Sequence, residues 1–236
     1  MCDYDKAQAM LPHPKMKPVR MPRNRALVTF SCYEYKDVMN VSSYNEVAMT
    51  IPVMVDPLVN VPVLPMIIDN FSKFGYFVFN MPVTSLENRI RGHKIWGLPK
   101  VLNTIDINVE NHVSTTSVTD EAGNTYFTLK VPTEGTNTHF DVKSNLYSRL
   151  DDELLQSQTC FEGNFNVTKF MDRLWSKGGS CNRSYLTIGQ GPHADLLRSL
   201  DIELQPFQLR YAPHMNACFD LPNPDFNSPL SFSEQT

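Results

Sequence analysis

The sequence predicts a mainly β protein, a barrel or sandwich of many short strands with few helices. Runs of β-branched and apolar residues recur along the chain, and turn-forming residues separate them, as is typical of strands. Only one stretch shows a strong helix pattern. With 236 residues and 42% hydrophobic content, the chain can bury a sizeable core, in one large domain or two small ones.

The strands are predicted from apolar runs and from alternation. Apolar or β-branched runs predict strands over residues 26–33, 46–55, 61–68 and 74–80. Alternating apolar and polar positions predict two more, at 101–109 and 112–119. The turn DEAGN then separates HVSTTSVT from TYFTLKV, and Gly123 can adopt the positive φ that a hairpin needs. Further strands are predicted over 137–143, 158–167, 183–189 and 206–220.

One helix is strongly predicted, over residues 84–96. It opens with a capping-box pattern, because Thr84 is followed three residues later by Glu87. Gly97 supplies a C-terminal cap, and Pro99 prevents the helix from continuing. Its apolar stripe consists of Val83, Leu86 and Ile90. Shorter helices are predicted over 168–175 and 193–200.

The chain divides into three predicted parts. Residues 1–25 form a basic, proline-broken arm, residues 26–222 a single β domain, and residues 223–236 a C-terminal tail that is loosely ordered or docked on a neighbour. We expect the arm to be solvated; a basic lip over an anionic substrate is the alternative. Its charges are Lys6, Lys15, Lys17, Arg20, Arg23 and Arg25 against Asp3 and Asp5.

Composition excludes several classes of function. The net charge of -4 gives no general attraction for nucleic acid or anionic membranes. The N-terminus lacks an apolar signal region and prolines break the most hydrophobic stretch, so we expect a cytoplasmic protein with no membrane span. Five widely spaced cysteines without a CxxC pair indicate reduced thiols. The six histidines show no HxH or HxxxH spacing, which gives metal binding little support.

Motifs for familiar enzyme classes are missing as well. No GxSxG, P-loop or GxGxxG occurs, which argues against hydrolase, nucleotide and dinucleotide sites. We therefore expect neither a metal nor an organic cofactor. Two charged residues in apolar surroundings are left as candidates for chemistry.

Lys100 is the first candidate. It follows Gly97 and Pro99 in GHKIWGLPKVLN, so it stands at the start of a strand among apolar neighbours. Lysine is rarely buried without a partner, and on local sequence alone a side chain that reaches the surface is the expected arrangement.

Glu46 is the second candidate, because it is the single acid in the strand SSYNEVAMTIPV. Alternation readily supplies an outward-facing glutamate at such a position. A buried Glu46 would instead need a partner, and Lys100 is a conceivable one. Local sequence leaves both arrangements open.

Three segments resemble acetoacetate decarboxylases and their relatives, in the same order along the chain. GHKIWGLPK is similar to the segment that carries the Schiff-base lysine of that family. SSYNEVAMTIPV resembles the strand with the family's catalytic glutamate, and GPHADLLRSLDIELQPFQLRYAPHMNACFDLP resembles its C-terminal segment. The similarity runs from about residue 20 to residue 222. Each motif alone is only moderately specific, whereas three in the right order are much stronger.

The resemblance implies a fold, a site and a partner. The fold would be the family's cone-like antiparallel β-barrel, and the protein would be a homo-oligomer acting on a small keto acid. Lys100 would form the Schiff base, and Glu46 would be the acid or base beside it. We expect Leu98, Phe79 and Val101 to bind the substrate.

The sequence also departs from the family's pattern. Val101 stands where the decarboxylases have a second lysine, and His93 and Lys94 stand where they typically have Arg and Glu. Their N-terminal arginine and second glutamate have no match. Candidates for the arginine's role in binding the substrate carboxylate are Arg20, Arg23, Arg25 and Arg91.

These departures leave the reaction open. An amine attacks a ketone only when it is unprotonated, and acetoacetate decarboxylase is a known case of a lysine activated by desolvation or a neighbouring cation. Desolvation alone can lower a buried lysine's pKa by about 3–5 units, so the second lysine is not required. We therefore expect a lyase that decarboxylates a 3-oxo acid. The alternatives are a Schiff-base aldolase or dehydratase, and a β-barrel that binds a small ligand without turnover.

Overall fold

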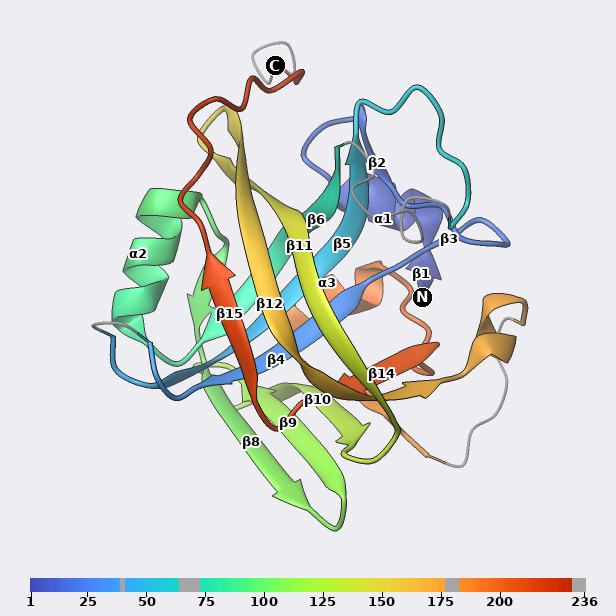
Figure 1. The fold of residues 1–236 in the computed structure, drawn as a ribbon, viewed down its shortest axis with the longest axis vertical. Coiled ribbons are helices and arrows are strands. Elements are labelled where there is room, and N and C mark those ends of the chain that lie inside the picture. The colour runs from blue at the N-terminus through green and yellow to red at the C-terminus, as the bar shows by residue number, and fades with distance from the viewer. Residues whose placement is uncertain (39–40, 64–72, 177–182, 231–236) are drawn as a thin grey trace.

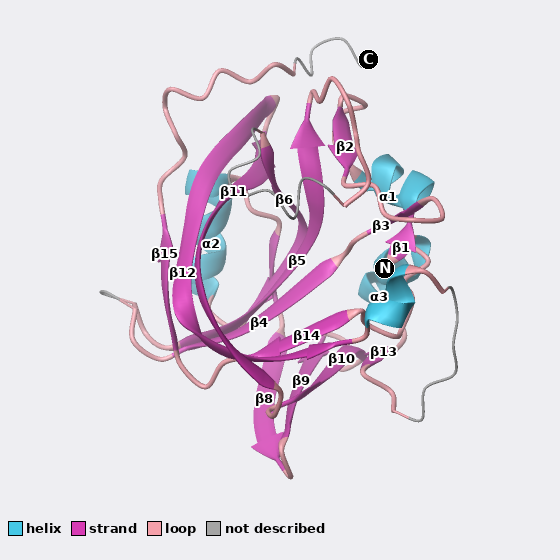
Figure 2. Cartoon of the chain, turned by 45° about the vertical axis from the view of Figure 1, so that its right-hand side comes forward, coloured by secondary structure: helices cyan, strands magenta, loops and turns pink. Residues whose placement is uncertain are grey.

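The computed structural model describes residues 1–38, 41–63, 73–176 and 183–230. In these residues a large sheet curls into a half-barrel, a smaller sheet packs below it, and the helices lie on two opposite sides (Figures 1 and 2). The predicted mainly β class is confirmed.

The large sheet has the order β14-β12-β11-β6-β5-β2, with β15 added to β12, β4 to β5 and β7 to β6. Most of its pairs are antiparallel, and β6 is parallel to both β7 and β11. Its strands are β2 (Met16–Pro18), β4 (Thr29–Tyr35), β5 (Tyr44–Val55), β6 (Phe74–Val83), β7 (Lys100–Leu102), β11 (Thr136–Leu150), β12 (Glu153–Lys169), β14 (Gln208–Tyr211) and β15 (Met215–Phe219).

The small sheet has the order β13-β10-β9-β8, and β1 pairs separately with β3. The predicted DEAGN hairpin is confirmed: β9 and β10 pair antiparallel, and Gly123 at the turn has φ +84. The strands are β8 (Thr104–Glu110), β9 (Val113–Thr119), β10 (Thr125–Pro132), β13 (Leu186–Ile188), β1 (Cys2–Asp3) and β3 (Arg25–Ala26).

Three helices and one 3-10 turn complete the described part of the chain. They are α1 (Tyr4–Met10), α2 (Leu86–Trp96), α3 (Pro192–Ser199) and the 3-10 helix η2 (Met171–Leu174). Figure 2 shows α2 on the opposite side of the curled sheet from α1 and α3. Among the helices of the described residues, none is long and apolar enough to cross a membrane.

Strand β5 is buried along most of its length because both of its faces are covered. Ile51, Val53 and Val55 pack into a core with α1, whereas Ala48 packs beneath α2 with Leu98. A strand buried on both faces needs an almost continuous apolar sequence, which VAMTIPVMV supplies. Glu46 precedes that run and is also buried, so a charge lies inside the sheet.

The predicted solvated arm at residues 1–25 is wrong. Helix α1 buries Tyr4 and Ala7 in the main core, and β2 extends the large sheet by pairing with β5. Arg25 is 2% exposed, although it was counted among the arm's solvated charges. The prediction of a solvated arm rested on the basic residues of the segment. Its buried apolar residues follow neither the helix period nor the strand period, so their burial was not apparent from the sequence.

The helix at 84–96 is confirmed, with two corrections. The N-cap is Ser85, whose side chain accepts from the N–H of Asn88, so the predicted capping box of Thr84 and Glu87 does not form. The predicted apolar stripe is also wrong, because Leu86 is 52% and Ile90 45% exposed. Gly92 is the one buried residue of this helix.

Other boundaries differ more modestly from the predictions. The helix expected over 168–175 is only the 3-10 turn η2, and the strand expected over 206–220 is split into β14 and β15. Residues 61–63 are not a strand, and the rest of the run predicted over 61–68 lies outside the described residues. In the predicted tail, Leu230 is buried in the main core.

Candidate active site

Helix α2 and the turn after it place Lys100 at the start of β7. Gly97 ends the helix in the left-handed conformation, with φ +59, and a β-carbon there would lie 2.5 Å from the carbonyl oxygen of Arg149. A side chain at this position would be strained and crowded. Leu98, 2% exposed, then anchors the turn in the core, and the N–H of Lys100 donates to its carbonyl oxygen.

Glu46 comes from the other side of β6. It lies opposite Val83 of β6 and Tyr33 of β4, whereas Lys100 lies beside Met81 on the other edge of β6. The two strands β5 and β7 therefore flank β6, and their two charged side chains meet across it.

Lys100 and Glu46 form a buried ion pair. The Nζ of Lys100 lies 2.5 Å from Oε2 of Glu46, and the two side chains are 8% and 6% exposed. Of the two arrangements left open by the sequence, the buried pair is the one found. Taking two charges out of water costs several kcal/mol per ion, and only close approach offsets that cost. Such a pair is weak evidence of stability and better evidence of a functional role.

Gly92 makes room for the lysine. A β-carbon at this position would lie 2.6 Å from Cδ and 2.7 Å from Cε of Lys100. The aliphatic stem of Lys100 therefore lies directly against the backbone of α2, and any larger residue would displace it. The helix also ends here, and the partial negative charge at its C-terminus stabilises a nearby cation by about 0.3–1 kcal/mol.

Apolar and aromatic side chains surround the pair. Ala48, Val78, Met81 and Leu98 form a buried cluster, against which Tyr33 packs. The rings of Tyr33 and Tyr35 lie 5.5 Å apart. Burial, with a smaller contribution from the Glu46 carboxylate, raises the pKa of both phenols. Each therefore stays protonated and able to donate a hydrogen bond.

A third tyrosine, Tyr44, joins Tyr33 and Tyr35 near the ion pair. Tyr44 stacks on Tyr35 with ring centroids 4.7 Å apart, and burial raises its pKa as well. Tyr44 and Glu46 are two residues apart on β5 and so point to the same face. The sequence patterns YNE in β5 and YEY in β4 together could have predicted these aromatic neighbours of the ion pair, whereas no single tyrosine predicts them.

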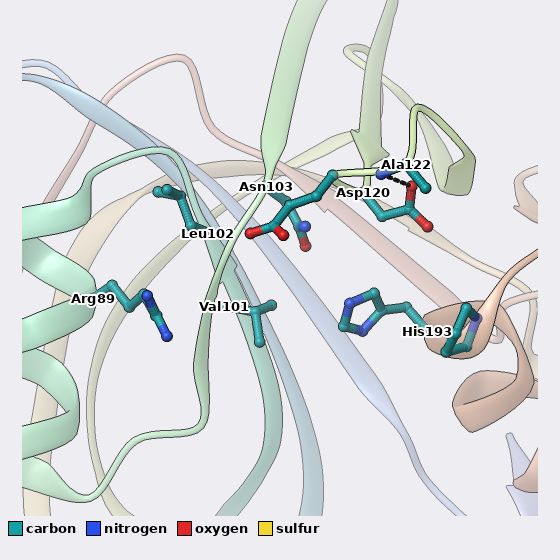
Figure 3. A pocket seen from close by; sticks show the side chains of 9 residues that line it. Arg89, Val101, Leu102, Asn103, Asp120, Ala122 and His193 are labelled. Carbon is teal, nitrogen blue, oxygen red and sulfur yellow. Dashed lines mark hydrogen bonds between the residues drawn. The ribbon is translucent and has the colours of Figure 1, made fainter.

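The residues predicted to bind substrate lie in different places. Leu98 belongs to the cluster beside Lys100. Phe79 instead packs against two other core clusters, that of α1 and that of the small sheet. Val101 lines a cleft between α2 and α3 that Lys100 does not line (Figure 3).

The candidate arginines are also separated from one another. Arg25 is held inside the molecule by Glu203 at 3.0 Å and by the carbonyl oxygens of Pro22 and Leu174. The guanidinium of Arg20 lies over the ring of Tyr4 at 4.4 Å.

Arg91 is linked to the candidate site through Tyr44. It pairs with Glu87 on α2, one residue before Gly92, and its charge acts on Tyr44. In the described residues, no group of three His, Cys, Asp or Glu side chains lies close enough to hold a metal.

Comparison with known proteins points to one family. The family model described as acetoacetate decarboxylase (ADC) matches residues 1–152. Among curated proteins, no sequence matches this chain. Acetoacetate decarboxylase from Legionella pneumophila subsp. pneumophila str. Philadelphia 1 is similar in structure, with a TM-score of 0.57 at 16% identity over 94% of this chain and 79% of that one.

Two further solved structures have similar folds. One comes from structural studies of acetoacetate decarboxylase, with a TM-score of 0.57 at 14% identity, covering 94% of this chain and 81% of the other. The second is the enduracididine biosynthesis enzyme MppR complexed with pyruvate, with a TM-score of 0.56 at 11% identity, covering 94% and 82%. These neighbours establish the fold, and the family model covers more than half of the sequence. The chain belongs to the acetoacetate decarboxylase family.

Proposed function

We propose that this protein is a lyase whose Lys100 forms a Schiff base with a short keto acid and decarboxylates a 3-oxo acid. The observation that carries the proposal is the ion pair of Lys100 with Glu46, 2.5 Å long and almost fully buried. The family's fold and the resemblance of GLPK to its lysine segment support the same assignment.

The pair can generate the nucleophile without an outside base. The Lys100 ammonium gives one proton to the Glu46 carboxylate, which leaves a neutral amine beside a carboxylic acid. The amine attacks the substrate ketone, and the acid returns its proton to the departing hydroxyl, which leaves as water. The products are a protonated imine on Lys100, one water molecule and the restored Glu46 carboxylate.

The protonated imine then acts as the electron sink. The electrons of the bond between the α-carbon and the carboxylate move into the imine, which releases carbon dioxide and leaves an enamine. A proton from solvent water adds to the enamine carbon and restores the imine, and a water molecule then hydrolyses the imine to the ketone and the Lys100 ammonium. Glu46 and the C-terminus of α2 stabilise the positive charge in every step that carries it.

An aldol reaction is the second candidate. There the same enamine would attack an aldehyde in place of accepting a proton. The observation that favours it is Val101, which lines the cleft of Figure 3, so the residue after Lys100 supplies no second ammonium. One neighbour of similar fold is the enzyme MppR complexed with the condensation product of pyruvate and imidazole 4-carboxaldehyde, at a TM-score of 0.54 and 11% identity.

Product analysis distinguishes these reactions. The protein is incubated with acetoacetate, and separately with pyruvate plus an aldehyde, beside the variant Lys100→Met as the blank for spontaneous decay. Acetone and carbon dioxide above the blank support decarboxylation. A carbon–carbon condensation product without carbon dioxide supports the aldol reaction and overturns decarboxylation. If no substrate is consumed and no adduct forms, both reactions are refuted and ligand binding without turnover remains.

A further inference from the structure

The cleft between α2 and α3 lies beside β7, whose Val101 and Leu102 line it. It has a volume of about 340 Å³, within the usual range for small-molecule sites. Helix α2, the hairpin between β9 and β10, and the start of α3 form its walls (Figure 3). Lys100 and Glu46 do not line it, and the chemistry proposed above makes no use of it. The lining residues are Arg89, Val101, Leu102, Asn103, Asp120, Glu121, Ala122, Pro192 and His193.

Asn103 is the first indication that the cleft takes a ligand. Its side chain is held by Tyr126, whose hydroxyl donates to Oδ1 at 2.9 Å, and the residue is only 8% exposed. No described residue accepts a hydrogen bond from its Nδ2, which lies in the wall of the cleft. Because this donor is open to the cleft, an acceptor from a ligand can bind to it directly.

The start of α3 adds further donors. Its N-cap is Gly191, which offers no side chain to cap the helix, and Pro192 occupies the first turn. The N–H of His193, which lines the cleft, has no intrahelical acceptor and is thus available to a ligand, as is usual at an uncapped helix start. The imidazole of His193 is fixed by stacking on Tyr126, with centroids 4.9 Å apart.

The charges of the cleft decide which class of ligand fits. Among the described residues that line it, Arg89 is the one arginine or lysine, and Asp120 and Glu121 are carboxylates. Backbone hydrogen bonds from Asn124 and Ala122 hold the pKa of Asp120 below its usual range, so it is ionised. Arg89 and Glu121 make no ion pair with any described residue, although both line the same cleft.

We infer that this cleft binds an α-amino acid with an apolar side chain. A simple anion would meet two carboxylates and a single arginine, and a simple ammonium would meet Arg89 and the donors of Asn103 and α3. A zwitterion satisfies both sets: its carboxylate faces the donors and its ammonium faces the acids. Val101, Leu102 and Pro192 supply the apolar surface for its side chain.

Nuclear magnetic resonance titration with L-leucine tests the inference. Two half-molecules serve as matched probes, 4-methylpentanoate without the ammonium and 3-methylbutylamine without the carboxylate. L-Leucine is expected to give saturable shifts at His193 and the Asn103 amide, and each half-molecule to bind at least tenfold more weakly. Equal binding of all three probes, or no saturation by L-leucine, would overturn it.

Variants locate the site. Arg89→Gln and Glu121→Gln each remove one charge from an exposed residue and are expected to weaken L-leucine binding about tenfold. Asn103→Asp keeps the acceptor for Tyr126 but removes the amide donor, and should weaken binding as well. The matched control is Arg91→Gln, on the same helix but outside the cleft, which should bind normally. If Arg91→Gln weakens binding as much as Arg89→Gln, the binding is not at this cleft.

Discussion

The Nζ of Lys100 and the Oε2 of Glu46 lie 2.5 Å apart although 54 residues separate them in the sequence. Helix α2 ends at Gly97 so that Lys100 enters the sheet beside β6, and β5 presents Glu46 from the other side of the same strand. The site is therefore a product of sheet topology, and its properties can be tested one residue at a time.

The first prediction concerns the energetic coupling of the pair. Lys100→Met leaves the Glu46 carboxylate buried without a partner, and we expect it to lower the free energy of unfolding by about 3–5 kcal/mol. The double variant Lys100→Met/Glu46→Gln should be more stable than Lys100→Met alone, because the unpaired charge is gone. Urea unfolding of the protein and its variants measures both quantities.

The exposed pair of Arg91 and Glu87 is the control for that cycle. Its side chains are 46% and 60% exposed, so its coupling should be only about 0.3–0.5 kcal/mol. Should Lys100→Met prove as stable as the unmodified protein, the pair would not be buried as described.

The second prediction concerns Gly92. In an exposed helix, Gly→Ala stabilises by about 1 kcal/mol, because alanine has the better helix propensity. Here the new β-carbon would push the stem of Lys100 away from α2, so Gly92→Ala should lose at least tenfold in the rate of adduct formation with a keto acid. Mass spectrometry of the trapped adduct measures the rate. The control is Lys94→Ala, an exposed position on the same helix, and equal rates for both variants would refute the role of Gly92.

The third prediction concerns the N-terminal segment. Arg25 is inside the molecule and pairs with Glu203, so Arg25→Met should cost about 3–5 kcal/mol in the free energy of unfolding. Arg23→Met changes an exposed arginine two residues earlier and should cost less than about 0.5 kcal/mol. Thermal or urea unfolding compares the two. Equal effects would mean that residues 1–25 are a solvated arm after all.

The fourth prediction is a dependence of stability on alkaline pH. Burial raises the pKa of the Cys32 thiol from 9.0 to about 12. Between these values the unfolded chain has lost the thiol proton and the folded protein keeps it, so stability falls as pH rises. The slope approaches about 1.4 kcal/mol per pH unit for this one group. Cys32→Ser should flatten the fall in urea unfolding measured from pH 9 upward, and an unchanged slope would contradict the raised pKa of this half-buried thiol.

The local signals that were read correctly concern single elements. Gly97 and Pro99 fixed the end of α2 because a left-handed glycine and a following proline leave the chain few alternatives. The hairpin at Gly123 was also predicted correctly. The prediction of an apolar stripe at Val83, Leu86 and Ile90 was wrong, because helical spacing shows which residues share a face but not whether another layer of the structure covers that face.

What the sequence could not provide is the contact between distant elements. Glu46 and Lys100 were individually visible as charges in apolar runs, but their pairing depends on β5 and β7 both flanking β6. Local sequence patterns do not show the order of the strands in the sheet. Local sequence likewise cannot show whether Phe79 and Val101 lie beside Lys100, because the face to which each side chain points depends on the register of β6 and β7.

Trapping with borohydride tests the central claim, that Lys100 is a Schiff-base nucleophile, most directly. The protein is incubated with acetoacetate or pyruvate, reduced, digested and mapped by mass spectrometry, with Lys94 as an internal exposed lysine. We predict a reduced adduct on Lys100 alone, and its loss in Lys100→Met. Adducts spread over exposed lysines, or none on Lys100 with either keto acid, would contradict the claim.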